Sequence, residues 1–402
     1  MTHYDVVING GGLAGAVLAL GLSQLERADG STLRIALIER SAPDQNRHPG
    51  FDARSIALAG HSCELLQQLG LWSLLRDLAT PITAIQVSDQ GHFGQVNMQA
   101  QDYSVPALGN VIELAPVGQL LYQQLQQHPA IELFCPAQIA TWQQAADQVM
   151  VTLDNDQRLT TSLLVAADGH HSRISRQLKL PRRQFDYQQS AIIANVQTAM
   201  PHQGRAFERF TPEGPIALLP MSGERCSLVW CVSNARAKQL MACDDSAFLT
   251  RLQQEFGYRL GRITRTGTRH CYPLVLDEVT RPWHHRVVLV GNAAHLLHPI
   301  AGQGFNLGLR DVAALVEQVR QALLDPSEAE HPVDLGSHQL LSRYGQSRQA
   351  DQAALVGITS ALALLFSNDH PVLAAGRNLG LMTMAACSSL KHSLAWQAMG
   401  KR

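Results

Sequence analysis

The sequence predicts an α/β fold: a Rossmann-like dinucleotide-binding domain, an inserted and mostly antiparallel β-sheet domain, and a C-terminal helical region. Three observations predict it. The chain opens with an apolar strand pattern that runs directly into a glycine cluster and a small-residue helix. Short alternating segments fill residues 190–275, which is typical of antiparallel strands. Long helical patterns occupy most of the chain after residue 311.

The opening glycine cluster has the spacing of a phosphate-binding turn. A strand pattern over residues 4–9 ends in Gly10-Gly11-Gly12-Leu13-Ala14-Gly15, which contains G-x-G-x-x-G. This spacing suits a tight turn, close approach to a pyrophosphate and close helix–strand packing. A second strand pattern, over residues 34–38, ends at Glu39, where a carboxylate would meet the ribose hydroxyls of an adenine dinucleotide. A plain turn with a surface glutamate is the alternative, and the complete strand–turn–helix–strand–acid pattern argues against it.

Composition excludes several classes of protein. The 402 residues carry 32 basic and 33 acidic side chains without a basic tract, so we expect no nucleic-acid partner. The seven cysteines are scattered and form no C-x-x-C, which indicates reduced thiols and a cytoplasmic location. The first strand pattern leaves no room for a signal peptide. No uncharged apolar run reaches the ~20 residues of a membrane span, and residues 354–366 come closest.

Between the two strand patterns and the inserted sheet, two charged residues stand out. Arg54 follows a polar loop and precedes a segment that runs into a helical pattern ending near Gly70. At such a helix start it is either a solvated residue or a phosphate partner. Residues 81–108 have a loose pattern of short extended pieces. The buried strand pattern 163–167 then ends at Asp168-Gly169, where a ligand contact is expected in a dinucleotide-binding sheet.

A second small-residue block follows the strand pattern 286–290. It begins at Gly291-Asn292, and its Gly302-Gln303-Gly304 turn opens a helix whose positive end would face a bound anion. Pairs of histidines occur at 170–171, 284–285 and 295/298, but no acid or cysteine stands at ligand spacing. We therefore predict no metal site. No Ser-His-Asp or nucleophile-elbow pattern is present.

Together these blocks resemble those of the flavin-dependent aromatic hydroxylases of the p-hydroxybenzoate hydroxylase type. The shared blocks are the N-terminal glycine motif with Glu39, Asp168-Gly169, and residues 291–306, in the same order. The resemblance covers essentially the whole chain. Within that family the sequence looks most like the ubiquinone-biosynthesis hydroxylases, and among these the 2-octaprenyl-6-methoxyphenol hydroxylases. The segments 48–58, 204–211 and 291–294 carry this closer likeness.

On this basis the α/β chain divides into three parts. Residues 1–80, 105–178 and 282–325 form the Rossmann-like FAD-binding domain. Residues 81–104 and 179–281 form the inserted, mostly antiparallel β-sheet substrate domain, and residues 326–402 form the C-terminal helical region.

The resemblance also implies a cofactor site. The first glycine turn and Glu39 would hold the ADP half of FAD, and Gln119 and Arg54 would approach the pyrophosphate or the flavin. Asp168 would lie where FAD and the nicotinamide donor meet, and residues 301–306 would lie against the isoalloxazine. The predicted cofactor-binding residues are Gly10, Gly12, Leu13, Ala14, Gly15, Glu39, Arg54, Gln119, Asp168, Gly291, Asn292, Gly302, Gln303, Gly304 and Asn306. No side chain is assigned to catalysis outright; the candidates are Arg54, His298 and Pro299, and packing is the alternative role for His298.

Two positions depart from the family pattern. Asn292 stands where an aspartate usually binds the ribityl hydroxyl; its amide can accept the same hydrogen bond without charge. Ser175 stands where an arginine usually follows the Asp-Gly block, and Arg173 and Arg176 flank it. These departures concern local cofactor geometry.

The implied reaction transfers hydride from NAD(P)H to FAD and then hydroxylates an electron-rich phenol with O2. The implied substrate is a 2-polyprenyl-6-methoxyphenol, converted to the 1,4-benzoquinol, and other ubiquinone-biosynthesis proteins are implied partners. With no second G-x-G-x-x-G after a strand, we expect the nicotinamide donor to bind without its own Rossmann domain.

The apolar segment 354–390 is equally compatible with peripheral membrane contact and with ordinary core helices. The open alternatives are hydroxylation at another ring position, an FAD-dependent dehydrogenase or oxidase, and a non-catalytic flavin-binding scaffold.

Overall fold

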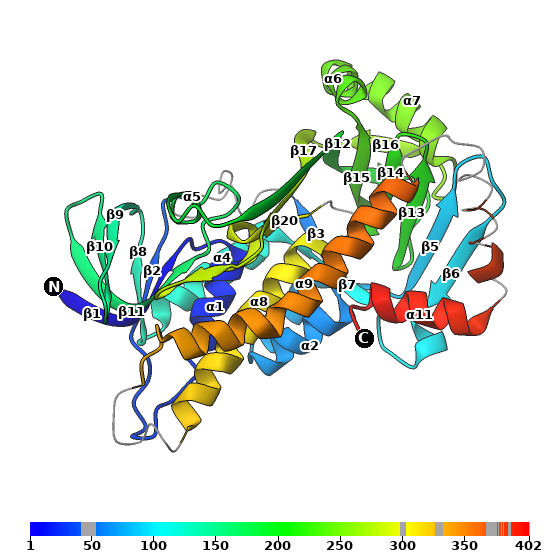
Figure 1. The fold of residues 1–402 in the computed structure, drawn as a ribbon. Coiled ribbons are helices and arrows are strands. Elements are labelled where there is room, and N and C mark those ends of the chain that lie inside the picture. Colours follow the sequence, from blue (N-terminus) through cyan, green and yellow to red (C-terminus); the bar gives the residue numbers. More distant parts are fainter. Residues whose placement is uncertain are drawn as a thin grey trace.

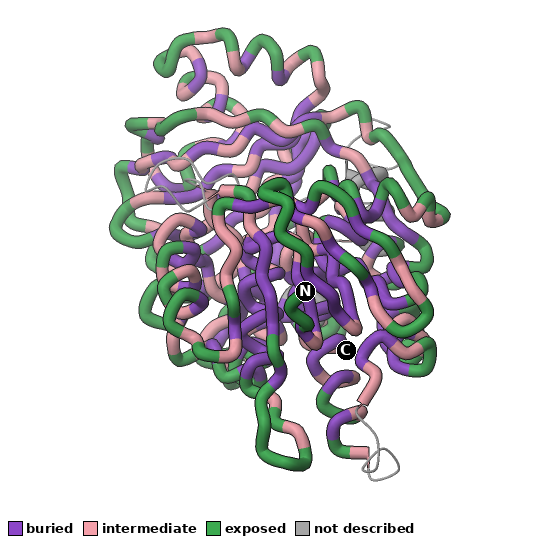
Figure 2. Tube along the Cα trace, turned by 90° about the vertical axis from the view of Figure 1, so that its left-hand side faces the viewer, coloured by how far each residue is buried: buried purple, intermediate pink, exposed green. Residues whose placement is uncertain are grey.

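The computed structural model describes residues 1–41, 54–297, 303–325 and 333–366, together with 376, 378, 380, 382–384 and 387–401. Within these residues two large sheets adjoin, and helices pack against both of them (Figure 1). Buried residues run through the centre of the molecule (Figure 2). The predicted α/β class, with one largely parallel and one mostly antiparallel sheet, is confirmed.

The first sheet is parallel at its centre and has the order β18-β19-β11-β1-β2-β8. Strand β1 (Thr2–Asn9) lies between β11 (Arg158–Ala166) and β2 (Ile35–Ile38), and both pairings are parallel. The flanking strands are β8 (Ile131–Phe134), β19 (Val287–Leu289) and β18 (Trp283–His284). Its central strands are apolar runs because both faces of the sheet are covered.

Strand β1 shows how both faces are covered. Val6 and Ile8 point into a core built with helices, whereas Val7 points into a second core with Trp142 and Val149. The helices of the first core include α1 (Leu13–Leu22), α4 (Leu114–Gln127), α8 (Gln303–Leu324) and α9 (His338–Phe366). The second core lies under β9 (Ile139–Gln144) and β10 (Val149–Leu153). Helix α1 is buried along almost its whole length, which explains its small and apolar residues.

The second sheet has the order β20-β17-β12-β15-β14-β13-β5-β6, with β16 paired to β12. All of its pairings are antiparallel except the one between β13 and β5. The loosely patterned segment 81–108 therefore contributes two regular strands to this sheet. Its strands are β5 (Ala84–Asp89), β6 (Gln95–Gln99), β12 (Arg182–Thr198), β13 (Arg205–Thr211), β14 (Gly214–Pro220), β15 (Arg225–Ser233), β16 (Ile263–Thr266), β17 (His270–Val279) and β20 (His295–Leu296).

Two helices cover the outer face of this second sheet. They are α6 (Asn234–Ala242) and α7 (Asp245–Phe256), drawn at the top of Figure 1. Trp230 packs against Phe248 with ring centroids 5.7 Å apart, and both are buried. The other face of the sheet is left for the cavity described below.

A small third sheet corrects one expectation about Arg54. The residue lies directly before a strand, β3 (Ser55–Ala59), and the helix α2 (Gly60–Gln68) begins only after that strand. Strand β3 forms because it pairs with β7 (Gly109–Glu113), which also pairs with β4 (Ala79–Ile82). A pattern read along the chain could not reveal this distant partner.

The C-terminal part returns to the second sheet. Helix α11 (Ser388–Ala398) packs against β6, where Val96, Met98, Ala395 and Met399 form a buried cluster. The remaining short elements are α3 (Trp72–Leu75), α5 (Arg173–Gln177) and 3-10 turns at Arg76–Leu78, Ala100–Tyr103 and Gly291–Ala293. No described helix is long and apolar enough to cross a membrane. The residue boundaries of the three predicted domains stay a prediction.

The crossing of α1 over the end of β1 depends on glycine. A Cβ atom at Gly15 would lie 1.9 Å from the carbonyl oxygen of Gly10. Gly10 itself has φ +109°, and a Cβ there would lie 2.6 Å from the carbonyl oxygen of Ala167. At Gly12, by contrast, a Cβ would meet nothing within 4 Å.

We predict that Gly15→Ala lowers the free energy of unfolding by about 2 kcal/mol or more, because the added methyl forces α1 away from β1. Gly12→Ala is the matched control and should cost at most about 1 kcal/mol, since its methyl enters open space. Chemical denaturation of the FAD-free proteins measures both. Equal stabilities for the two variants would contradict the close packing described here.

Candidate functional site

A cavity of about 1560 Å³ opens where the two large sheets meet. One end lies at the carboxyl ends of the parallel strands β1, β2 and β11, where open α/β sheets bind their ligands. The other end lies against the inner face of the second sheet. The first end is rich in polar and charged groups, and the second is largely apolar. Polar residues of the first end include Asn9, Glu39, Arg40, Ser41, Arg54, Asp168 and Arg173.

The start of α1 could hold an anion in the polar end. Gly12 is the N-cap residue of α1, and no side chain caps the helix there. The first N–H groups of a helix have no partner within it, and the helix dipole adds positive charge. Because the space above Gly12 is open and faces the cavity, a pyrophosphate fits against these N–H groups.

Glu39 is fixed beside this turn at the end of β2. Its Oε2 accepts a hydrogen bond from the Gly11 N–H at 2.6 Å, and its Oε1 accepts one from the Ser41 N–H at 2.9 Å. The carboxylate lines the cavity in this position. It is therefore held where the ribose of a dinucleotide would reach it.

Asp168 follows the end of β11 and also lines the cavity. Burial raises the pKa of its carboxyl, against the lowering effect of a hydrogen bond with Ser172. One carboxyl oxygen, Oδ1, is buried and has no hydrogen-bond partner among the described residues. A buried acceptor without a donor costs about 1–3 kcal/mol, so a ligand hydroxyl that donates to it would bind favourably.

The turn at Gly291 brings the late block to the same cavity. Gly291 has φ +58° and packs against α8, where a Cβ at Gly308 would lie 3.1 Å from the Gly291 Cα. Asn292 is exposed and lines the cavity, as do Gly304 and Phe305 at the start of α8. Ser175, the second departure from the family pattern, is buried; its hydroxyl donates to the Ala293 carbonyl and accepts from Arg182.

The structure thus brings most of the predicted cofactor residues together. The predicted residues that line the cavity are Gly10, Gly12, Leu13, Ala14, Glu39, Arg54, Asp168, Gly291, Asn292 and Gly304. Gly15 does not line the cavity but packs against the backbone of Gly10 in the turn. Gln119 is exposed on α4 and does not line the cavity, and only the backbone of Gln303 is described. Gly302, His298 and Pro299 lie outside the described residues.

Asn306 does not line the cavity but forms hydrogen bonds with β3, which does. Its Oδ1 accepts hydrogen bonds from the Ala59 N–H at 2.9 Å and the Ser62 hydroxyl at 2.6 Å. Its Nδ2 donates to the Ala57 carbonyl at 2.9 Å. The side chain therefore fixes β3 and the start of α2 to α8, and direct contact with a cofactor stays a prediction.

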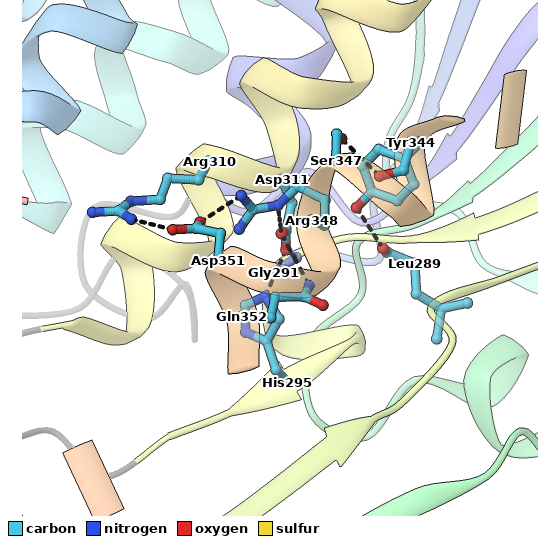
Figure 3. Close-up of polar contacts among 10 residues, drawn as sticks. All are labelled: Leu289, Gly291, His295, Arg310, Asp311, Tyr344, Ser347, Arg348, Asp351 and Gln352. Carbon is cyan, nitrogen blue, oxygen red and sulfur yellow. Dashed lines mark hydrogen bonds and ion pairs between the residues drawn. The ribbon is translucent and has the colours of Figure 1, made fainter. Parts of the chain in front are cut away.

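A buried carboxylate that the sequence did not single out, Asp311, holds the turn at Gly291 in place (Figure 3). His295 Nε2 lies 2.6 Å from Asp311 Oδ2, and Arg348 Nε donates to Oδ1 at 2.8 Å. The Gly291 N–H also donates to Oδ2, at 3.1 Å. Burial alone would raise the pKa of Asp311, but the charges of and hydrogen bonds from His295 and Arg348 outweigh it and hold that pKa below its usual value.

This arrangement gives His295 a structural role. Among the described residues no group of three or more His, Cys, Asp or Glu side chains is arranged as metal ligands. The sequence carried no signal for the network, because Arg348 lies in a separate helix, α9, with no patterned spacing to Asp311.

We predict that Asp311→Asn lowers the free energy of unfolding by about 3 kcal/mol or more, since it leaves Arg348 buried without its counter-charge.

The contribution of Asp311 to stability should also depend on pH. Because folding lowers the Asp311 pKa, this contribution is present above the unfolded-state pKa of about 4 and is lost as the pH falls through the folded-state pKa. Urea unfolding between about pH 3 and 7 measures this. Asp77→Asn, at an exposed position, is the control; an equal acid dependence in Asp311→Asn and wild type would contradict the prediction.

Comparison with known proteins agrees with this geometry. Residues 3–356 match the family described as "FAD binding domain". The chain is 35% identical to the ubiquinone hydroxylase UbiL of Rhodospirillum rubrum, over 98% of this chain and 89% of that protein. It is 30% identical to the 3-demethoxyubiquinol 3-hydroxylase of Escherichia coli, over 98% of each chain.

Among solved structures, the p-nitrophenol 4-monooxygenase PnpA of Pseudomonas putida aligns over the whole of both chains, with a TM-score of 0.79 and 16% identity. At that identity the likeness shows the fold alone. The sequence relatives confirm the resemblance to the flavin-dependent hydroxylases that the motif blocks suggested, and FAD is the cofactor. The chain therefore belongs to the FAD binding domain family and is an FAD-dependent monooxygenase.

Proposed function

We propose that the protein hydroxylates a polyprenylated phenol in ubiquinone biosynthesis, using NAD(P)H and O2, and that it converts a 2-polyprenyl-6-methoxyphenol to the 1,4-benzoquinol. The observation that carries this proposal is the single cavity, which joins the polar end at Gly12, Glu39 and Asp168 to a long apolar end. Two sequence relatives that act in hydroxylation of ubiquinone or its precursors by name support the substrate class.

The apolar end suits a prenyl chain. Residues from the second sheet, from β4, from the loop before β7 and from the C-terminal helices line it together: Ile82, Ile85, Val87, Met98, Leu108, Met384 and Leu394. Each buried CH₂ group of a ligand contributes about 0.8 kcal/mol, so a prenyl tail gains substantial binding energy from this wall. An ordinary small-molecule pocket measures about 300–1,000 Å³. At about 1560 Å³ this cavity has room for a dinucleotide and a second molecule.

The residues of the cavity would bind FAD and enclose the reacting ring. The N–H groups at the start of α1 would hold the pyrophosphate of FAD, and Glu39 and Asp168 would bind its hydroxyls. FAD supplies the hydride and oxygen chemistry when bound. Arg54 lies with its guanidinium 5.3 Å from the ring centre of Tyr272, and both line the cavity. Arg54 therefore stands at the boundary between the polar and the apolar end, and the apolar walls exclude water from the reacting ring.

Peripheral membrane contact is a second part of the proposal. Helix α11 contributes Leu394 to the cavity wall, while Leu390 and Trp396 of the same helix are 46% and 45% exposed. Lys391 and Lys401 lie beside them, and they also form ion pairs with Asp102 and Glu64. Exposed apolar side chains with flanking cations are typical of helices that rest on a lipid surface, and here they adjoin the tail-binding end.

We predict that Gly12→Val folds but loses FAD, because its branched side chain fills the space that a pyrophosphate needs. The purified variant should hold less than about a tenth of the wild-type FAD, measured by absorbance after denaturation. Gly357→Val is the matched control: it lies exposed on α9, outside the cavity, and its Cβ also meets nothing within 4 Å. A folded Gly12→Val protein with normal FAD content would refute the assigned site.

The reaction itself is tested with 2-geranyl-6-methoxyphenol, NAD(P)H and isotopically labelled O2. We expect NAD(P)H oxidation that depends on the phenol, and a product that carries one labelled oxygen para to the original hydroxyl. Label at another ring carbon would indicate a hydroxylase of a different ring position. Reduction of O2 to H2O2 without a hydroxylated product would favour an oxidase, and FAD binding without NAD(P)H oxidation would favour a scaffold. The FAD-free Gly12→Val protein is the control for uncatalysed oxidation.

A further inference from the structure

One carboxylate lies in the apolar part of the cavity. Three carboxylates line the cavity among the described residues: Glu39 and Asp168 at the polar end, and Glu208 on β13 of the second sheet. Glu39 and Asp168 have the dinucleotide roles argued above. Glu208 lies on the second sheet, away from the strand ends that carry Glu39 and Asp168, and its position requires a separate explanation.

The neighbours of Glu208 on the inner face of the sheet are apolar. Across the strands it lies opposite Val87 of β5 and Ala217 of β14, and the same row continues through Val229 and Ile193. Along β13, the residues two positions away are Ala206 and Phe210, both buried. All six neighbours line the cavity: Val87, Ile193, Ala206, Phe210, Ala217 and Val229.

The Glu208 side chain is half-buried, and its open side faces the cavity. No described residue forms a hydrogen bond or an ion pair with its carboxylate. Burial alone raises the pKa of Glu208 to about 7. A carboxylate kept among apolar side chains costs folding energy, and a perturbed carboxyl in a ligand cavity is typical of a functional group.

The other titratable and charged groups nearby do not neutralise Glu208. Cys231 of β15 faces the same side, and burial, together with the charge of Glu208, raises the pKa of its thiol. Arg209, the next residue on β13, donates from Nε to the Glu255 carbonyl at 2.8 Å, and side chains alternate along a strand. Asp89 of β5 pairs with His92 at 3.2 Å. His270 of β17 lies at the far end of the row, opposite Ile193.

We propose that Glu208 binds the hydroxyl of the phenol substrate and accepts its proton during hydroxylation, an inference that rests on the proposed function. The O–H bond of the phenol breaks, its electron pair stays on the phenol oxygen, and the proton moves to a carboxylate oxygen of Glu208. The resulting phenolate is a stronger electron donor, so its ring reacts more readily with an electrophilic oxygen. After hydroxylation the proton returns from Glu208 to the product oxygen, which restores the carboxylate.

The overall reaction balances without a further reagent. The phenol, O2, NAD(P)H and one proton give the dihydroxylated ring, NAD(P)+ and water. A general base works best when its pKa is near the operating pH, as the raised pKa of Glu208 allows. Because Glu208 accepts a proton only when ionised, turnover of the phenol should rise as the pH rises through about 7.

The test compares Glu208→Gln with wild type on 2-geranyl-6-methoxyphenol and on ring-fluorinated derivatives whose hydroxyl pKa falls below the assay pH. With the parent phenol, Glu208→Gln should lower kcat/KM by about 100-fold or more and abolish the rise in kcat/KM near pH 7. With the most acidic derivatives, which bind already ionised, the ratio of wild-type to variant kcat/KM should shrink to less than about 10-fold. Each ratio is taken on the same phenol, so the effect of fluorine on ring reactivity cancels.

Glu213→Gln is the matched control, because Glu213 is exposed in the turn that follows β13. Both variants should retain wild-type FAD content and melting temperature, which excludes misfolding as the cause of a loss. A deficit of equal size for every phenol would mean that Glu208 only positions the ring, and it would overturn proton transfer. Wild-type turnover and pH profile in Glu208→Gln would overturn the inference as a whole while leaving the proposed function intact. If the wild-type protein hydroxylates none of these phenols, the proposed function fails and the inference fails with it.

Discussion

The buried charge of Asp311 is the interaction on which the site's framework depends. This carboxylate is fully buried on α8 and joins the Gly291 turn, β20 and α9 in one network. The network continues outward, because Arg348 and Arg310 both pair with Asp351 (Figure 3). Arg310 also donates to the Gly400 carbonyl at 2.9 Å. The paired charges hold these elements together, and removal of one member would leave the others buried without a counter-charge. The Gly291 turn, which lines the cavity, and the C-terminal residues beside its apolar end are therefore parts of one electrostatic unit.

The two sheets divide the chemistry of the cavity between them. The parallel sheet ends its strands in exposed backbone groups and carboxylates, which bind anions and hydroxyls. The antiparallel sheet offers a continuous apolar face with Glu208 embedded in it. Because the faces meet in one cavity, a molecule with a reactive polar head and a long apolar tail finds complementary surroundings for both parts.

Features encoded in neighbouring residues were predictable from the sequence, and features that depend on distant pairing were not. The β1–α1–β2 unit and Glu39 follow from spacing along the chain, because the tight turn and the strand ends are local. The strand at 55–59 could not be predicted because it forms by pairing with the distant strand β7. The pairing of Asp311 with Arg348 depends on the packing of α8 against α9. In the sequence Glu208 stood out only as part of the segment 204–211. Which face of the sheet it occupies is set by the pairing of β13 with β5 and β14.

The parallel pairing of β5 with β13 also has a consequence for how the chain folds. Thr83 and Gly204, which meet where this pairing begins, are 121 residues apart in sequence. During synthesis the β5–β6 hairpin emerges long before β13, so the edge of β5 that β13 later covers stays unpaired meanwhile. Contacts of such long range also slow folding, because loop closure precedes any gain from pairing. Recovery of the intact protein from cells should therefore depend more on chaperone supply and growth temperature than on the stability of the finished fold.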